Sequence, residues 1–204
     1  ERVSESWMNL LPQARSRPSE VRVHMDSPDA PDVIGRALVD SASGLVRSAD
    51  GIVLLCVGTD RSIGDALGPL VGTFVEERRP AGFSVLGTLE KPVHAGNLVE
   101  TVGWLKRNYR RPLVIAVDAC LGRTESIGVL TVAPGSLLPG AGVNKTLPPV
   151  GDVHVTGVVN VGGFMEYFVL QNTRLSLVMR MASVAAAGIH QGLQRLAMRR
   201  RPSC

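Results

Sequence analysis

A chain of 204 residues has the length of one domain, and 45% hydrophobic with 20% charged residues is typical of a soluble globular protein. Aromatic residues make up only 4%, which argues against the stacking platforms that bind single-stranded nucleic acid. The formal net charge of +4 equals the contribution of four arginines near the C-terminus, which indicates a solvated basic tail and no nucleic-acid-binding face; they are Arg195, Arg199, Arg200 and Arg201.

The first 30 residues and the cysteines give information on the cellular compartment of the protein. Prolines and arginines interrupt any period in residues 1–30, so we expect a weakly ordered segment there, and it has no apolar core of a signal peptide. No apolar run approaches the ~20 residues that a membrane span needs. Three cysteines without a CxxC spacing favour reduced thiols. The sequence therefore predicts a cytoplasmic protein that does not bind a membrane.

From residue 31 onward, helical and strand patterns alternate. Helices are expected at residues 31–46, 69–78, 94–108 and from 173 onward; strands are expected at residues 52–57, 83–86, 113–117, 128–132 and 153–161. A proline- and glycine-rich loop is expected at residues 134–151. Such alternation predicts parallel pairing and a three-layer α/β/α sandwich with a mostly parallel central sheet. We expect this single domain to span residues 31–196, with a basic tail at 197–204.

The most informative stretch covers residues 53–72 and reads VLLCVGTDRSIGDALGPLVG. Its apolar start is typical of a strand buried on both faces, and Pro69 suits the first turn of a following helix. Asp60, Arg61 and Asp65 are therefore expected on a loop at the carboxyl end of a strand, where open α/β sheets place their sites. Two ordinary roles stay open: Asp65 as a helix cap, and an ion pair between Asp60 and Arg61.

A second carboxylate, Asp118, ends the strand expected at residues 113–117. If the two strands are neighbours, Asp65 and Asp118 face one crevice, where mutual repulsion leaves one as an acid and the other as a base. An aspartate at a strand end can also simply fix a loop. His154 could complete a mixed oxygen and nitrogen site for zinc or nickel with the two carboxylates, or it could be structural.

Several common motifs are absent. The first strand is followed by neither GxGxxG nor the GxxxxGK[ST] phosphate loop, so no cofactor is predicted. No GxSxG nucleophile elbow occurs. Cys120 would need a nearby histidine to act as a nucleophile, and its strand position favours a buried thiol.

Five segments together resemble the YyaC-type sporulation proteins; they are residues 56–72, 87–97 (GTLEKPVHAGN), 115–122 (IAVDACLG), 139–160 and 161–179. The similarity extends over roughly residues 50–185. That family resembles the spore germination protease and, more distantly, the hydrogenase maturation proteases. The resemblance implies a phosphorylase/hydrolase-like three-layer fold.

The resemblance also implies roles for particular residues. Asp65 and Asp118 match the catalytic aspartates of the germination protease, and Asp60, Arg61, Glu90 and His154 are expected to bind substrate or to support the pair. In the maturation proteases, the matching acidic positions and a histidine recognise nickel, which would here be Asp65, Asp118 and His154.

We therefore expect a sporulation-associated peptidase that hydrolyses a protein or peptide substrate, such as small acid-soluble spore proteins, in the cytoplasm of a sporulating cell or forespore. Two alternatives stay open: a catalytically silent binding or regulatory module on the same fold, and a metal-recognising maturation-type endopeptidase. The sequence leaves the oligomeric state open, a homo-oligomer included.

Overall fold

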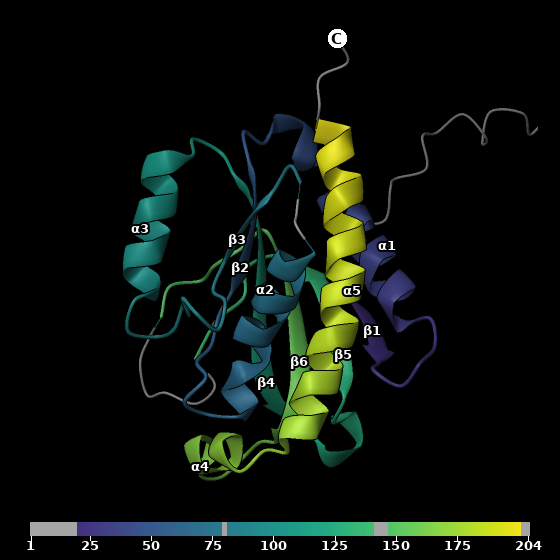
Figure 1. The fold of residues 1–204 in the computed structure, drawn as a ribbon, viewed down its shortest axis with the longest axis vertical. Helices are drawn as coiled ribbons and strands as arrows, with labels where there is room; N and C mark the ends of the chain where they lie inside the picture. The colour runs from purple at the N-terminus through teal and green to yellow at the C-terminus, as the bar shows by residue number, and fades with distance from the viewer. Residues whose placement is uncertain (1–19, 79–80, 141–146, 201–204) are drawn as a thin grey trace, which may run out of the picture.

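The computed structural model describes residues 20–78, 81–140 and 147–200 (Figure 1). The strands are β1 (Val21–His24), β2 (Ile52–Cys56), β3 (Ser84–Leu86), β4 (Leu113–Gly122), β5 (Val129–Pro134) and β6 (Val153–Val161). The α-helices are α1 (Ala30–Ala42), α2 (Leu67–Glu77), α3 (Leu98–Asn108), α4 (Glu166–Gln171) and α5 (Leu175–Arg200).

The strands form one sheet in the order β1-β5-β6-β4-β2-β3. Strand β2 pairs in parallel with β3 and β4, and β4 pairs in parallel with β6. Strands β5 and β1 extend the sheet antiparallel at its other edge. All five residues of β2 are buried, as its unbroken apolar sequence predicts for a strand covered on both faces. The expected α/β class with a mostly parallel sheet is confirmed.

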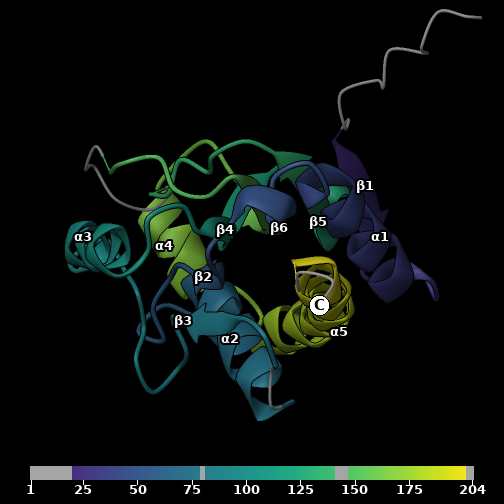
Figure 2. The same cartoon turned by 90° about the horizontal axis from the view of Figure 1, so that it is seen from above.

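Helices cover both faces of the sheet (Figure 2). Helices α1, α2 and α5 lie on one face, where Leu54 of β2 and Ile189 of α5 belong to one buried cluster. Helix α3 lies on the other face, where Leu98 and Leu105 pack with Leu55 of β2. Alternate residues of β2 thus fill two separate cores, as the two-residue period of a strand requires. Among the described residues, no helix combines the length and hydropathy needed to cross a membrane.

The expectation of weak order in residues 1–30 is wrong for its last part. Strand β1 and the start of α1 lie within it, while residues 1–19 lie outside the described residues. Strand β1 is only four residues long, and its side chains are alternately half-buried and exposed. So short a strand contains too few repeats of the two-residue period to be recognised in the sequence. The domain also extends further at its other end, because α5 continues to Arg200, past the expected boundary at residue 196.

The segment between β6 and α5 contains the short helix α4, which the sequence pattern did not predict. Its preceding residue, Met165, has a φ of +51°, an unusual left-handed conformation for a residue with a side chain. Six residues are too few for a helical period to stand out. Helix α4 lies beyond the carboxyl end of β6 (Figure 1), so it belongs to the edge of the sheet where sites form.

Candidate active site

The loop after β2 folds back tightly and thereby positions Asp65. Gly58 has a φ of +140°, and a Cβ atom there would lie 2.0 Å from the Asp65 carbonyl oxygen. Only glycine therefore fits, and the next residue, Thr59, donates its N–H to that same oxygen at 3.2 Å. Asp65 lies in a single 3-10 turn (Gly64–Ala66) before α2. Its side chain does not cap α2, so the helix-cap interpretation is wrong.

Asp118 comes from the neighbouring strand. The register pairs Val117 of β4 with Cys56 at the end of β2, so Asp118 lies one residue beyond that pair. Its side chain is only 5% exposed, and the Ala119 N–H donates to its Oδ1 at 2.8 Å. The strands are neighbours, as the two-carboxylate hypothesis required.

Both carboxyl groups line one pocket of about 100 Å³. Its walls come from the loop after β2, from the turn before α3, from the 134–151 loop and from α4; they include Val57, Thr59, Ser62, Ala95, Pro139, Leu147, Tyr167 and Leu170. A small pocket with mostly apolar walls and two convergent carboxyl groups is the kind of place where pKa values diverge.

The two carboxyl groups differ in their electrostatics. Burial raises the pKa of Asp118 well above its usual range, the negative charge of Asp65 raises it further, and the Ala119 N–H opposes both effects. Burial also raises the pKa of Asp65, but the Thr59 N–H and the His94 imidazole oppose that rise. Asp118 is therefore the group that retains a proton, while Asp65 is the group that ionises first.

Two polar residues of this site escaped the sequence interpretation. His94 is close enough to Asp65 to lower its pKa, because the chain after β3 returns to β2, where Val93 pairs with Val57. Ser62 is 7% exposed, and its Oγ has no hydrogen-bond partner among the described residues. A buried hydroxyl without a partner costs free energy, so this atom is free to bind something that enters the pocket.

The remaining predicted residues lie outside the pocket. Asp60 and Arg61 are exposed, and the described residues contain no ion pair between them, so the pairing interpretation is wrong. Glu90 lies on an exposed turn. Cys120 does not line the pocket, and burial raises the pKa of its thiol, which disfavours a nucleophilic thiolate.

His154 has a structural contact and no contact with the pair. It lies on β6 opposite Ala116, and its Nδ1 donates to the Gly135 carbonyl oxygen over 2.9 Å, which holds the start of the 134–151 loop. Across the described residues, no group of three His, Cys, Asp or Glu side chains is arranged to hold a metal ion. The metal set of Asp65, Asp118 and His154 is therefore wrong, and the residues do not fit the nickel site that the family resemblance implied.

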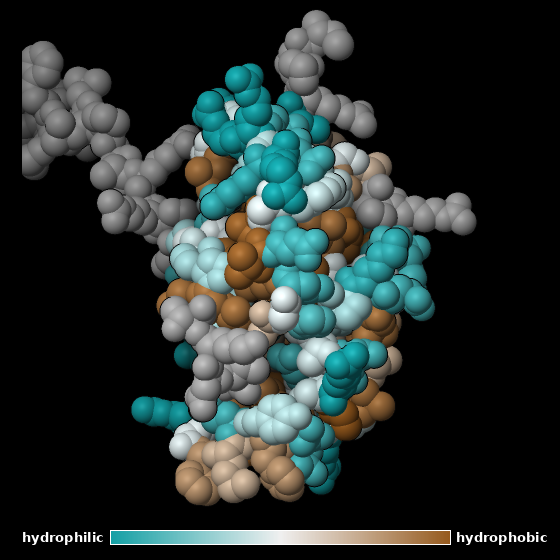
Figure 3. Space-filling model, turned by 90° about the vertical axis from the view of Figure 1, so that its left-hand side faces the viewer, coloured by the Kyte–Doolittle hydropathy of each residue, from teal (hydrophilic) through white to brown (hydrophobic). Residues whose placement is uncertain are grey.

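An exposed apolar patch adjoins the pocket. We call the α4 patch the four side chains Phe164, Met165, Tyr167 and Phe168, which are 82%, 59%, 60% and 56% exposed. In Figure 3, apolar residues gather at the lower end of the molecule, where α4 lies in Figure 1. Tyr167 belongs both to this patch and to the pocket wall. Exposed patches of this kind commonly mark binding surfaces.

Residues 22–188 match the model of a family described as "Protein of unknown function (DUF1256)". The chain is 55% identical over 149 residues to the uncharacterized protein YyaC of Bacillus subtilis (strain 168), covering 72% of this chain and 73% of that protein. In structure it is similar to the [NiFe] hydrogenase maturation protease HycI from Thermococcus kodakarensis KOD1, with a TM-score of 0.51 and 21% identity over 77% of this chain and 98% of HycI. The likeness to HycI shows a shared fold.

Proposed function

The chain belongs to the DUF1256 family, and from the geometry of the pocket we propose that it is a peptidase that uses Asp65 and Asp118 to hydrolyse a peptide bond. The observation that carries the proposal is the pair of carboxyl groups in one small buried pocket with pKa values raised to different extents. Two such groups sharing one proton supply the base and the acid that amide hydrolysis requires.

The electrostatics assign the two roles. The ionised carboxylate of Asp65 takes a proton from a water molecule, whose oxygen forms a bond to the scissile carbonyl carbon. Asp118 donates its proton to the carbonyl oxygen, which gives a neutral tetrahedral intermediate. As the C–N bond breaks, Asp65 returns its proton to the leaving nitrogen, and Asp118 recovers the proton from the hydroxyl that becomes the new carboxyl group. Each proton is accounted for, and both residues end as they began.

Ser62 and the α4 patch support the reaction. The Ser62 hydroxyl, which has no other partner within the described residues, donates to the carbonyl oxygen as charge develops on it. Tyr167 and the rest of the α4 patch cover apolar side chains of the substrate beside the scissile bond.

The biological setting is part of the same proposal. The segments that resemble the YyaC-type sporulation proteins support a role in sporulation, which we place in the cytoplasm of the sporulating cell or forespore. Small acid-soluble spore proteins, the substrates that a germination-protease type of activity implies, are therefore the first substrates to try.

The proposal is tested by incubating the purified protein with small acid-soluble spore proteins and with an unfolded, alkylated protein, followed by mass spectrometry of the products. We expect discrete cleavage by the wild type and loss of at least about 10³-fold in kcat for Asp65→Asn and Asp118→Asn. Asp40→Asn, an exposed aspartate of α1, is the matched control and should keep full activity.

Full activity in both active-site variants would rule out the aspartate pair. Absence of cleavage by the wild type on every substrate would favour the alternative, a binding or regulatory module on this fold.

A further inference from the structure

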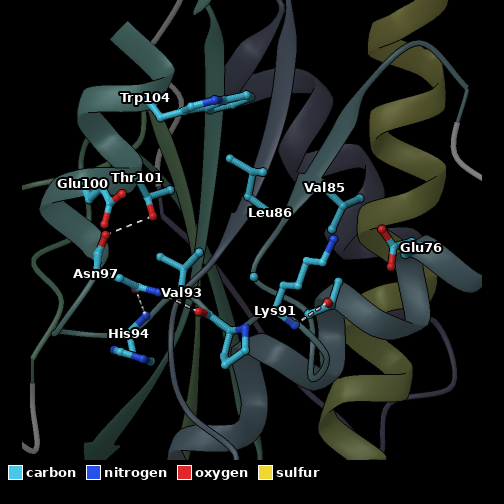
Figure 4. A pocket seen from close by; sticks show the side chains of 13 residues that line it. Glu76, Val85, Leu86, Lys91, Val93, His94, Asn97, Glu100, Thr101 and Trp104 are labelled. Atoms are coloured by element: carbon cyan, nitrogen blue, oxygen red, sulfur yellow. Dashed lines mark hydrogen bonds between the residues drawn. The ribbon is translucent and has the colours of Figure 1, made fainter. Parts of the chain in front are cut away.

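A second, larger pocket runs alongside β3 at the edge of the sheet (Figure 4). We call it the β3 groove; it has a volume of about 570 Å³ and lies between α2, which contributes Glu76, and α3, which contributes Trp104. Val85, Leu86 and Gly87 line it along the strand and just after it, and Val93 and His94 line its far end. The edge strand β3 therefore forms one side of the groove, so that its backbone as well as side chains can contact a bound molecule.

Strand β3 is the last strand of the sheet on this side. Among the described strands it pairs only with β2, in parallel, so its outer backbone N–H and C=O groups face away from the sheet. Such groups pair readily with an extended chain that lies beside them, which adds a strand to the sheet. Backbone pairing binds many sequences, because every residue except proline supplies the same donor and acceptor.

The side chains of the groove suit a polypeptide as well. Trp104 is 42% exposed and Leu86 is half-buried, so one wall offers an apolar surface (Figure 4). Glu76, Lys91 and Glu100 also line the groove, and none of them forms an ion pair within the described part of the chain. Two carboxylates against one ammonium leave an excess of negative charge, which favours a segment that carries basic residues.

The groove ends at the pocket that holds the two aspartates. Val93 lies outside the named strands but forms an isolated parallel bridge with Val57. Its carbonyl oxygen accepts the Gly58 N–H at 2.8 Å. The next residue, His94, lines the groove and also lowers the pKa of Asp65. Ala95, after it, lines the aspartate pocket. One turn of three residues therefore separates the two cavities.

We propose that the β3 groove binds an extended segment of polypeptide as an added strand on the outer edge of β3. Trp104 contacts a side chain of that segment, and the bound chain runs past His94 toward Asp65 and Asp118. The identification of the segment as part of a substrate rests on the proposed peptidase function, whereas binding itself does not.

The test measures binding separately from cleavage. Asp118→Asn is introduced to prevent hydrolysis, and Trp7→Phe leaves Trp104 as the single tryptophan of the chain. This protein is titrated with a nine-residue peptide of alternating threonine and leucine that carries a lysine at each end. Two further peptides of the same sequence are N-methylated at alternate amides, one in each of the two possible patterns, so that each keeps its side chains but cannot pair along one of its two edges.

We expect a saturable change in Trp104 fluorescence with the first peptide. The methylated peptide whose blocked edge faces β3 should bind more weakly by at least about 10-fold, because two or more backbone hydrogen bonds are lost. Both methylation patterns are used, so that one of them must block the edge. Hydrogen exchange of the β3 amides should slow with the first peptide and should not slow with the methylated peptide whose blocked edge faces β3.

Two variants locate the binding surface, with a fluorescein-labelled peptide as the reporter. Trp104→Ala should weaken binding, while Met198→Ala, which shortens an exposed apolar side chain of α5 that lines neither pocket, should leave it unchanged. Equal binding of all peptides, no binding at all, or loss only in Met198→Ala would overturn the proposal. A protein dimer that forms through β3 and excludes the peptide would overturn it in favour of a second copy.

The results separate this proposal from the peptidase proposal. Binding at β3 without any cleavage by the wild type would contradict the peptidase function alone. Cleavage that is unaffected by Trp104→Ala and by methylation facing β3 would contradict the groove alone.

Discussion

Asp118 places an ionisable group among apolar residues of a central strand. It follows Ile115, Ala116 and Val117, which are all buried, and it is itself almost fully buried. A carboxylate in such a place loses its hydration, and one backbone N–H compensates only in part. A site that destabilises the folded protein in this way is commonly retained for its chemistry.

We expect Asp118→Asn to stabilise the protein at neutral pH by about 1–2 kcal/mol. The folded state raises the pKa of Asp118, so the unfolded chain loses its proton first, and wild-type stability falls as pH rises above the unfolded carboxyl pKa of about 3.9. Asparagine cannot ionise, so its advantage should be small at about pH 4 and should grow toward neutral pH. Thermal unfolding of both proteins across this range measures the difference. An advantage that shrinks with rising pH would contradict the assignment.

Ser62→Ala should lower kcat by about 10²-fold while leaving KM nearly unchanged, because the hydroxyl is expected to act on the developing charge. Stability should not fall, since the Oγ atom has no partner to lose among the described residues. Steady-state kinetics on the substrate found above provide the measurement, with Ser176→Ala on the exposed surface of α5 as the control. A rise in KM alone would indicate a binding role without catalysis.

At the scale of elements, the packing of α1 against α5 depends on close backbone approach. A Cβ atom at Gly188 of α5 would lie 2.6 Å from the Pro31 carbonyl oxygen and 2.7 Å from the Ile34 Cβ atom. The two helices therefore pack more closely here than an ordinary side chain would allow. This contact holds α5 against one face of the sheet, where its side chains are buried together with side chains of β2 and β4.

Gly188→Ala should destabilise the protein, although alanine is the better helix former. The helix propensity gain is about 1 kcal/mol, whereas the clash with backbone forces α1 and α5 apart at a cost of about 1–3 kcal/mol. Gly44→Ala is the control, because no atom lies within 4 Å of a Cβ atom there. Chemical denaturation compares the two variants with the wild type, and a Gly188→Ala protein as stable as the wild type or more so would show that the clash costs no more than the gain in helix propensity.

At the scale of the whole molecule, the site exists only because separate parts of the chain meet. The order of the sheet places β2 beside β4, the chain after β3 returns to Val57, and α4 closes the pocket from beyond β6. Together they bury Asp118 and partly bury Asp65, and this loss of water is the main cause of the raised pKa values.

Hydrolysis should therefore depend on pH as a bell-shaped curve that lies above the range of an exposed aspartate pair. Activity should rise as Asp65 ionises, with a midpoint above the ordinary carboxyl pKa of about 3.9, and should fall again as Asp118 loses its proton. The profile of kcat/KM measures both limbs. A rising limb at or below about pH 3.9 would contradict a buried, proton-sharing pair.

The amino-acid sequence was sufficient to predict the α/β class and most elements. The apolar run of β2 and the long stripe of α5 are signals that lie within one segment, because burial imposes its period locally. Asp65 and Asp118 were identified as candidates for the same reason: each follows a recognisable strand. Short elements such as β1 and α4 give too few periods and were missed.

Tertiary structure alone decided how these residues combine. It brought His94 to Asp65 and left His154 with Gly135, although neither histidine's neighbours in sequence distinguish the two outcomes. It left the Ser62 hydroxyl buried without a described partner, and it buried Asp118 more deeply than Asp65, which sets the proton's position. The physical reason is that proximity and desolvation depend on strand order and on the paths of distant loops, whereas a sequence pattern reports only the burial of its own segment.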